Sequence, residues 1–507
     1  MERIVAEPDD AVAASQVAAP ISYVPTPTAL YRQHRKATAL IDEPGAPRAG
    51  AAPLTEPAAT PYKFGARVLI WKQDPSVTDL GTRKAFLPGV VLAGPRDARI
   101  GAGAPGIAPV SPNAFGDFIT APNTDQFDAV HAFAVVRQTL TMYQRALAAG
   151  GSAAPVPWQW NGGGNVDPLL VYPHGLPNVM NAFYSRSLKS VKFGDFIPAG
   201  SATRVFTCRS FDIVSHETGH AVLDGLKPNW LLANNPPQTG GLHESFADLT
   251  AIFLTLSQLD QCEAIVAQTK AQLHDKTFLA DLAEQFGLAL GRSNGLRNAD
   301  NDLKLSEAGT EVHAISQVFT GAIYDILADI FALERAPGLI DDAAALHSVA
   351  EYLRGVVLRA LIGAPASAAS FADVANQMLR IVHADGKPVE YGNFIRNRFT
   401  LREVLVALVP LTEDHPPGLP LEAAVQDEPG AQQDRRACCG TMNHAEYFDV
   451  QQLLDDELQA LSLWCDSHDR CEPAHPSGNG HAVADTAPPA SAHAKRPAKP
   501  GGGPPQH

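Results

Sequence analysis

The spacing of apolar positions changes near residue 210, and this change predicts two kinds of architecture along the chain. Before it, short apolar runs such as 67–71 and 169–172 are bounded by glycine and proline, which is typical of strands joined by loops. One long helix is predicted among them, because apolar residues recur at helical spacing over 125–147. After residue 210 we expect helices over 211–226, 243–259, 261–272, 277–290, 312–334, 341–362, 370–384 and 401–409.

This order of elements predicts an α+β fold with two lobes. The first is a mixed β/α lobe over 62–226, and the second is a mainly helical lobe over 227–410. Residues 1–60 are rich in alanine and proline and hold two aromatic residues, so we expect a disordered arm there. Beyond the lobes we expect a linker over 411–445, a short helix over 446–466 and a disordered tail over 473–507.

Composition and charge exclude some classes of partner. The 507 residues include 40 glycines and 41 prolines, so part of the chain is loop and the folded core is shorter than the whole. The net charge is −15 and no long run of Lys and Arg occurs, which argues against a nucleic-acid partner. Because no run of about 18 uncharged apolar residues is present, we expect no membrane span and no membrane partner.

The first residues and the cysteines bear on the cellular compartment. The N-terminal segment is acidic and has no apolar stretch of the kind found in signal peptides. We therefore expect a cytoplasmic protein, with secretion by a non-classical route as the alternative. Six cysteines in 507 residues are too few for a disulfide scaffold, and we interpret them as ordinary thiols. The oligomeric state is unknown from the sequence.

The sequence His216-Glu217-Thr218-Gly219-His220 carries the strongest chemical signal. Flanking apolar residues recur at helical spacing, and residues four apart lie on one face of a helix. His216 and His220 can therefore present two imidazoles to one metal ion. Glu217 lies near enough to reach a water on that metal without binding the metal itself. Gly219 costs about 1 kcal/mol of helix propensity, which indicates that packing requires a small residue there.

A catalytic zinc site needs a third protein ligand and one open position. Glu244 follows His220 by 24 residues and shares a predicted helix face with Asp248. We expect Glu244 to be the third ligand, and Asp248 to accept a hydrogen bond from a ligand histidine. A solvated acidic face is the alternative, but the flanking Phe246 and Leu249 favour burial.

A HExxH helix followed by Glu-x-x-x-Asp at this separation resembles the gluzincins, and specifically the thermolysin-like metallopeptidases. Three further segments resemble that family in the same order, namely the helix from Asp125, the segment 181–184 and the segment 312–316. Together the similar segments span about 125–385. The resemblance implies a two-lobed thermolysin-like fold with one catalytic zinc ion in the cleft between the lobes.

The resemblance also implies which residues hydrolyse a peptide or protein substrate. His216, His220 and Glu244 would hold Zn²⁺, which lowers the pKa of a water towards about 7. Glu217 would take the proton of that water as general base and pass it to the leaving amine.

Four other residues match positions that contact the substrate in this family. Asn181 and the carbonyl of Ala182 would hydrogen-bond the peptide backbone. His313 would stabilise the oxyanion of the transition state. Arg297 would contact the substrate carbonyl, with Arg292 as the alternative.

The chain departs from the family pattern beside His313. The family has an aspartate five positions before this histidine, where this chain has Ala308. Either Glu307 or Glu311 takes its place, or the histidine is oriented differently.

Two other departures concern a tyrosine and calcium. The family has a tyrosine between the second zinc histidine and the glutamate ligand, but 221–243 contain none, and Trp230 cannot donate in the same way. Asp212 stands where one calcium ligand would be, but 249–259 contain no acidic residue. We therefore predict no calcium cluster of the family type, since calcium takes 6–8 oxygen ligands.

Two functions from different classes follow from these motifs. The first is a zinc endopeptidase. The second is a catalytically weak or inactive binding or scaffold protein on a metallopeptidase fold, which the missing tyrosine and Ala308 favour. A zinc hydrolase acting on a non-peptide amide cannot be separated from these by sequence.

Overall fold

The structure is a computed structural model that describes residues 65–405, except 78–79, 103–106, 153, 199, 284–286 and 288–294. The segments predicted at 1–60, 411–445, 446–466 and 473–507 lie outside these described residues. All described residues belong to one compact unit, Pro61–His507. The division of 62–410 into two lobes stays a prediction.

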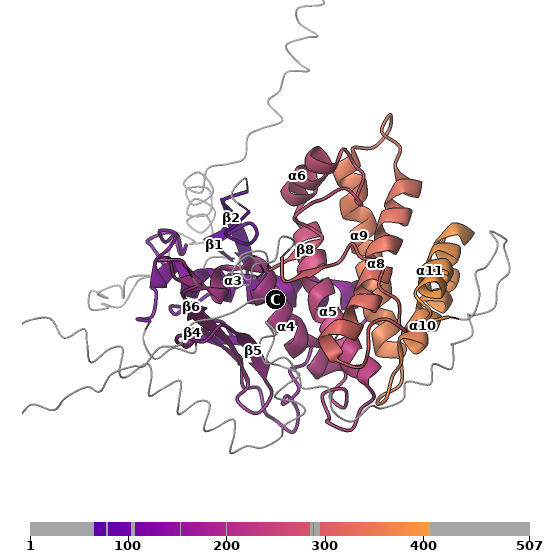
Figure 1. Cartoon of the computed structure of the whole chain (residues 1–507). Coiled ribbons are helices and arrows are strands. Elements are labelled where there is room, and N and C mark those ends of the chain that lie inside the picture. The colour runs from indigo at the N-terminus through magenta and orange to yellow at the C-terminus, as the bar shows by residue number, and fades with distance from the viewer. Residues whose placement is uncertain are drawn as a thin grey trace, which may run out of the picture. The chain divides into compact units, whose positions relative to one another are not determined.

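Strands and one long helix make up the first part of this unit (Figure 1). The strand predicted at 67–71, the helix at 125–147 and the strand at 169–172 are confirmed. The elements are β1 (Gly65–Trp71), β2 (Thr82–Pro88), β3 (Ile100–Ala102), α3 (Asp125–Ala149), β4 (Leu169–Leu176), β5 (Ala182–Ser185), β6 (Ser190–Phe196), β7 (Val205–Phe206) and the 3₁₀ helix η1 (Thr207–Arg209).

The strands form an antiparallel hairpin and a larger mixed sheet. Strands β1 and β2 make the hairpin, whereas the sheet has the order β3-β4-β6-β5. Within it β3, β4 and β6 run parallel, and β5 and β7 are antiparallel to β6. Among the described strands, β5 pairs with β6 alone, so one edge of β5 is left without a neighbouring strand.

Helices dominate the second part, which confirms a mixed helix and sheet structure with strands first and helices after. Two short strands form a small hairpin among the helices. The elements are α4 (Phe211–Leu226), α5 (Pro237–Leu256), α6 (Leu259–Thr269), β8 (Asp281–Leu282), β9 (Arg297–Asn298), α8 (Val312–Glu334), α9 (Asp342–Gly363), α10 (Phe371–Ala384) and α11 (Val389–Leu401).

The helix predicted over 277–290 is wrong for 277–283, which contain β8 instead. Every residue of 277–283 is buried, so the apolar positions that looked like one helix face are enclosed on all sides. The backbone is satisfied by a neighbouring segment, because Ala299 N–H donates to the Ala280 carbonyl at 2.8 Å. Tertiary enclosure thus overrides the helical spacing in this segment.

Several other helix boundaries differ from the prediction, and the largest differences are at α11 and α5. The helix expected over 401–409 is wrong over 402–405, because α11 begins after Pro388 and ends at Leu401. Residues 406–409 lie outside the described part of the chain. Helix α5 begins at Pro237 rather than at residue 243, and it continues through Gly241, where a Cβ atom would lie 2.8 Å from Ile315 and 3.0 Å from Phe371.

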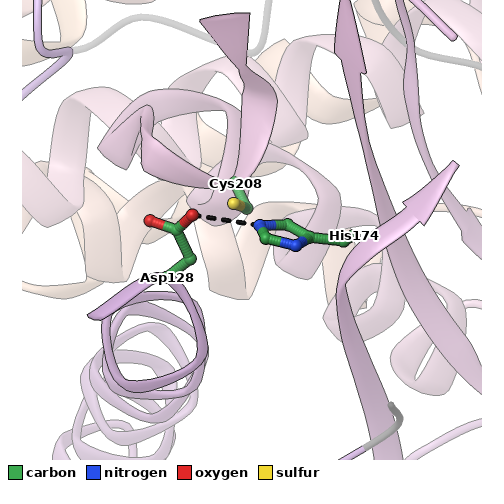
Figure 2. A group of neighbouring side chains, drawn as sticks. All are labelled: Asp128, His174 and Cys208. Carbon is green, nitrogen blue, oxygen red and sulfur yellow. Dashed lines mark hydrogen bonds and ion pairs between the residues drawn. The ribbon is translucent and has the colours of Figure 1, made fainter. Parts of the chain in front are cut away.

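An ion-pair network joins α3 to the sheet and to the segment before α4. Asp128 on α3 lies 3.0 Å from Nε2 of His174 on β4 (Figure 2). Arg209 in η1 donates to both carboxylate oxygens of Asp128, at 2.7 and 2.9 Å. Burial opposes ionisation of Asp128, but the hydrogen bonds from His174 and Arg209 outweigh it and lower the pKa of this carboxyl group. The network therefore orients η1, which leads directly into α4.

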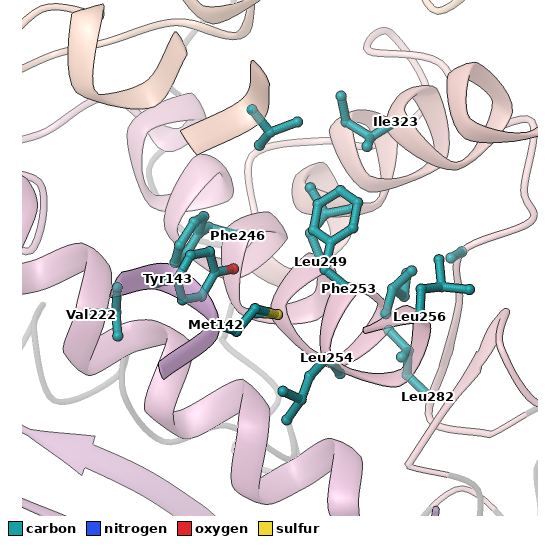
Figure 3. Close-up of a cluster of buried hydrophobic side chains, with 14 of the residues drawn as sticks. Met142, Tyr143, Val222, Phe246, Leu249, Phe253, Leu254, Leu256, Leu282 and Ile323 are labelled. Carbon is teal, nitrogen blue, oxygen red and sulfur yellow. The ribbon is translucent and has the colours of Figure 1, made fainter. Parts of the chain in front are cut away.

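Helix α5 lies at the centre of the core. All its residues from Thr239 to Leu256 are buried, and it packs against both α4 and α8. Figure 3 shows Phe246, Phe253 and Leu254 of α5 among side chains that include Tyr143 of α3 and Val222 of α4. Fully burying one such apolar side chain stabilises a fold by about 1.5–3 kcal/mol. This packing sets the position of the polar residues that α5 also carries.

Helix α8 has the length and composition of a membrane span. Among the described helices, only α8 is both long enough and apolar enough to cross a membrane, with a mean hydropathy of 1.3 over its most apolar 18 residues. The protein buries 83% of this stretch, as expected of a core helix.

Candidate metal centre

Helices α4 and α5 bring three potential metal ligands together. His216 and His220 lie one turn apart on α4, with their Nε2 atoms 3.2 Å apart. Each Nε2 atom lies 3.5 Å from a different carboxylate oxygen of Glu244 on α5. Tetrahedral zinc ligands at bond lengths of about 2.0–2.2 Å lie about 3.4 Å from one another. The spacing of the three side chains therefore fits one tetrahedral ion.

The charge of Glu244 also fits a bound cation. This side chain is fully buried, and neither carboxylate oxygen has a hydrogen bond within the described residues. Burial opposes ionisation, but the surrounding His313, His220 and His216 hold the pKa of Glu244 well below its usual range. A buried carboxylate without hydrogen bonds is costly, and a divalent cation would compensate it. Two imidazoles and one carboxylate are a common donor set for zinc.

Gly219 explains how α4 and α5 approach so closely. A Cβ atom at this position would lie 2.6 Å from Oγ1 of Thr250 and 3.0 Å from Cα of Ala247, both on α5. The sequence-based interpretation that packing requires a small residue here is confirmed. Any larger side chain would move α5, and Glu244 with it, away from the two histidines.

The outer nitrogen of His216 is held by two further residues. Oδ1 of Asp248 lies 3.0 Å from Nδ1 of His216, so the carboxylate can fix the ring orientation and leave Nε2 for a metal. Arg297 in β9 donates to the same Oδ1 atom, from Nη2 at 2.5 Å and from Nε at 3.1 Å. Its Nη2 atom is also 3.3 Å from Nδ1 of His216. Arg297 is thus part of the centre, whereas Arg292 lies outside the described residues.

A residue that the sequence analysis missed, His243, holds the other histidine. Its Nδ1 atom lies 2.7 Å from Nδ1 of His220, and the two rings stack with centroids 5.0 Å apart. Burial lowers the pKa of His243 to about 3, so this ring is neutral at ordinary pH. The signal available in the sequence was a histidine directly before Glu244, on the same helix.

His313 approaches the centre from the N-terminus of α8. Its Nε2 atom lies 3.5 Å from Glu244 Oε1, and its Nδ1 atom lies 2.5 Å from Glu311 Oε1. Glu311 also caps α8 by accepting hydrogen bonds from the backbone N–H groups of His313 and Ala314. Burial lowers the pKa of His313, but Glu244 and Glu311 outweigh it and raise this pKa above its ordinary value.

Of the two glutamates considered in place of Ala308, Glu311 is the one that contacts His313. Glu307 instead accepts a hydrogen bond from the backbone of Lys304. The orienting carboxylate thus comes from two residues before the histidine, where it also caps the helix.

Glu217 lies on α4, and the predicted substrate strand β5 packs against this helix. Glu217 follows His216 on α4 and is fully buried. Strand β5 packs against α4, and Tyr184 of β5 donates to Asp224 of α4 at 2.7 Å. Asn181 directly precedes β5, and its Oδ1 atom accepts a hydrogen bond from Ala182 N–H at 2.9 Å.

Trp230, which stands in the interval where the family has a tyrosine, makes its indole hydrogen bond to a residue outside the centre. Its indole N–H donates to the carbonyl of Pro365 at 3.1 Å. Two buried tyrosines, Tyr143 and Tyr184, contact Thr250 of α5 and Asp224 of α4 through their hydroxyl groups. The hydroxyl groups of these two tyrosines therefore do not replace the hydroxyl group of the tyrosine that the family has near the metal.

Two other clusters of potential ligands are better explained as ion pairs. In the group of Asp128, His174 and Cys208, the guanidinium of Arg209 already binds both oxygens of Asp128. A positive charge at that distance opposes a metal cation. The group of His274, Asp300 and Asp325 has the same feature, because Arg402 lies 2.9 Å from Asp325.

Comparison with known proteins adds little to what the residues of the centre indicate about function. No protein-family model matches the chain, and no curated protein matches it. One similar solved structure is described as "Precursor of Protealysin, Metalloproteinase from Serratia proteamaculans". The identity is 17% and the TM-score 0.36, over 56% of this chain and 80% of that chain. The functional argument therefore rests on the residues of the centre.

Proposed function

We propose that the chain is a zinc-dependent endopeptidase with a two-lobed thermolysin-like fold. The observation that carries the proposal is the group of His216, His220 and Glu244, whose ligand atoms lie 3.2–3.5 Å apart around one point. Glu217 stands between the two histidines in the HExxH sequence, as hydrolysis with a glutamate general base requires.

Zinc held by these residues would polarise the substrate carbonyl and lower the pKa of a water, so that this water could lose a proton and attack near neutral pH. Glu217 accepts the proton of the attacking water and delivers it to the leaving amine. Its burial excludes bulk solvent from this transfer. General acid–base catalysis of this kind contributes a factor of about 10²–10⁴ to the rate.

His313 stabilises the negative charge that develops on the carbonyl oxygen. Its Nδ1 atom is held by Glu311, so a proton on Nε2 faces the centre, beside Glu244. Removing one such donor in an oxyanion site typically raises the barrier by about 2.7–4 kcal/mol. Arg297 keeps Asp248 and His216 in place and is a second donor for the substrate carbonyl.

The substrate backbone binds along the edge of β5 that has no neighbouring strand among the described residues. An extended peptide adds to an exposed strand edge through main-chain hydrogen bonds. Asn181 and the carbonyl of Ala182 are the groups that we assign to this contact, and β5 packs directly against the helix that carries the two histidines. A peptide or protein is therefore the expected substrate.

The alternative is a binding or scaffold protein with weak or no turnover. It is favoured by one observation, the direction of the Trp230 indole towards Pro365, which leaves the position of the family tyrosine without a donor. A zinc assay combined with digestion of casein separates the two functions. Zinc binding without cleavage by the unmodified protein supports the scaffold.

The test of the peptidase mechanism is Glu217→Gln in the full chain. We expect about one zinc ion per chain in both proteins and a loss of hydrolysis of at least 100-fold in the variant. Glu263→Gln, at an exposed position on α6, is the matched control and keeps full activity. Undiminished cleavage by Glu217→Gln contradicts the mechanism, and a wild-type protein without zinc contradicts the metal site.

A further inference from the structure

A pocket between α10 and α11 has an unusual set of polar side chains. Its volume is about 130 Å³, and none of its lining residues belongs to the metal centre. Leu379, Val382, Pro388, Val389 and Gly392 form its apolar wall. The polar residues that line it are Arg380, His383, Lys387, Asn393 and Arg396.

The charge of this α10–α11 pocket is positive. Three permanent cations line it, together with His383, and no acidic residue is among the lining residues. Arg380 is exposed, and its guanidinium group has no hydrogen bond or ion pair to another side chain in the described part of the chain. Of the neighbouring acids, Asp385 is bound by Arg359 and by the hydroxyl group of Tyr352, and Glu390 lies in the first turn of α11 but does not line the pocket. Lys387 lies over the rings of Tyr352 and Tyr391, so Arg380 is the cation of this pocket whose charge the described residues leave available to an anion.

Asn393 supplies the second observation. The side chain is 1% exposed, yet neither its amide nitrogen nor its amide oxygen has a hydrogen bond within the described residues. A buried polar group without a partner costs about 1–3 kcal/mol. Since Asn393 lines the pocket, a ligand there can satisfy both atoms if it offers an acceptor and a donor.

The N-terminus of α11 opens onto the same pocket. Pro388 is the N-cap residue of this 13-residue helix, and no side chain caps it. Pro388 and Val389 both line the pocket, so the first backbone N–H groups of the helix lie beside it. Helix N-termini favour anions because these N–H groups and the helix dipole point towards them.

We propose that the α10–α11 pocket binds a phosphate group. The phosphate oxygens accept hydrogen bonds from Arg380, Arg396 and the amide nitrogen of Asn393. The P–OH group of hydrogen phosphate donates to the amide oxygen of Asn393, which a fully ionised carboxylate cannot do. Because these residues lie outside the metal centre, the proposal is independent of the peptidase function.

Isothermal titration of the full chain with inorganic phosphate, at constant ionic strength in chloride, tests this site. We expect saturable binding of one phosphate, weakened about tenfold by Arg380→Gln and by Asn393→Leu. Neither change is expected to unfold the protein, since Arg380 is exposed and leucine removes the unsatisfied amide. Lys84→Gln removes the same charge at an exposed position on β2 and leaves the affinity unchanged.

Three outcomes overturn the proposal. One is the lack of saturable binding, and another is an equal loss of affinity in Lys84→Gln. The third is phosphate binding that both pocket variants leave unchanged, which assigns the anion to another place, such as a metal ion. Acetate at the same ionic strength should bind more weakly than phosphate, and equal affinity contradicts the role of Asn393 as acceptor.

Discussion

His220 and His243 face each other through their Nδ1 atoms, which lie 2.7 Å apart in a fully buried environment. Only one of the two atoms can carry the shared proton. If His220 is to bind a metal through Nε2, its Nδ1 atom must donate and that of His243 must accept. His243 thereby selects the tautomer of a metal ligand, in the same way that Asp248 does for His216.

This relationship predicts that His243→Phe lowers zinc affinity by about 10–100-fold, because His220 loses its acceptor. His243→Asn is the matched control, since the amide oxygen can still accept the proton and should retain most of the affinity. Competition for zinc with a chromogenic chelator measures the difference. Equal affinity of the two variants would show that the shared proton does not matter.

A second prediction concerns the contact between α4 and α5. Gly219→Ala places a methyl group 2.6 Å from Thr250 Oγ1, so we expect a loss of about 1–3 kcal/mol in the free energy of unfolding, together with reduced zinc occupancy. Gly355→Ala on α9 is the control, because its Cβ atom meets nothing within 4 Å. There the better helix propensity of alanine should stabilise the protein by up to about 1 kcal/mol. Urea unfolding distinguishes the two, and similar effects in both would refute the steric argument.

The third prediction rests on the proposed peptidase function. Glu311→Gln weakens the orientation of His313 and removes a charge that raises its pKa, so we expect kcat to fall about tenfold while zinc content is unchanged. The alkaline limb of the pH–rate profile should shift to lower pH. Glu307→Gln removes a charge six residues before His313, which Glu307 does not contact, and should behave like the unmodified protein. If both variants lose activity to the same extent, a general electrostatic effect explains the loss and the contact between Glu311 and His313 does not.

The fourth prediction is an acid-dependent loss of stability through His131 on α3. Burial lowers the pKa of this histidine to about 3, against 6.5 for a histidine exposed to solvent. Between these values the unfolded chain binds a proton that the folded protein does not. Stability contributed by the neutral ring is therefore complete above pH 6.5 and is lost as the pH falls towards 3.

The measurement compares urea unfolding at pH 6.5 and pH 5 for the wild type and His131→Gln, which keeps an acceptor for the backbone N–H of Trp71. The wild type should lose about 2 kcal/mol more than the variant over this interval, at up to about 1.4 kcal/mol per pH unit. His347→Gln, at a partly exposed position on α9, serves as the control. An identical pH dependence in all three proteins would contradict the assignment.

Local sequence determined the first and last residues of two helices. Helices α4 and α8 begin and end where the spacing of apolar residues predicted, because their N-cap residues, Ser210 and Glu311, satisfy the first backbone N–H groups. Local sequence also placed the two histidines of the candidate centre side by side, since residues four apart lie on one face of a single helix.

Tertiary structure decided the features that depend on what encloses a segment. The apolar spacing of 277–283 favoured a helix, but burial on all sides and pairing with 296–299 produced an extended segment. The contacts of His243 and Arg297 depend on how α5 and β9 pack around α4. Sequence periodicity indicates which residues share one face of one helix or strand. These contacts join residues from separate elements, so the packing of the buried core sets their distances.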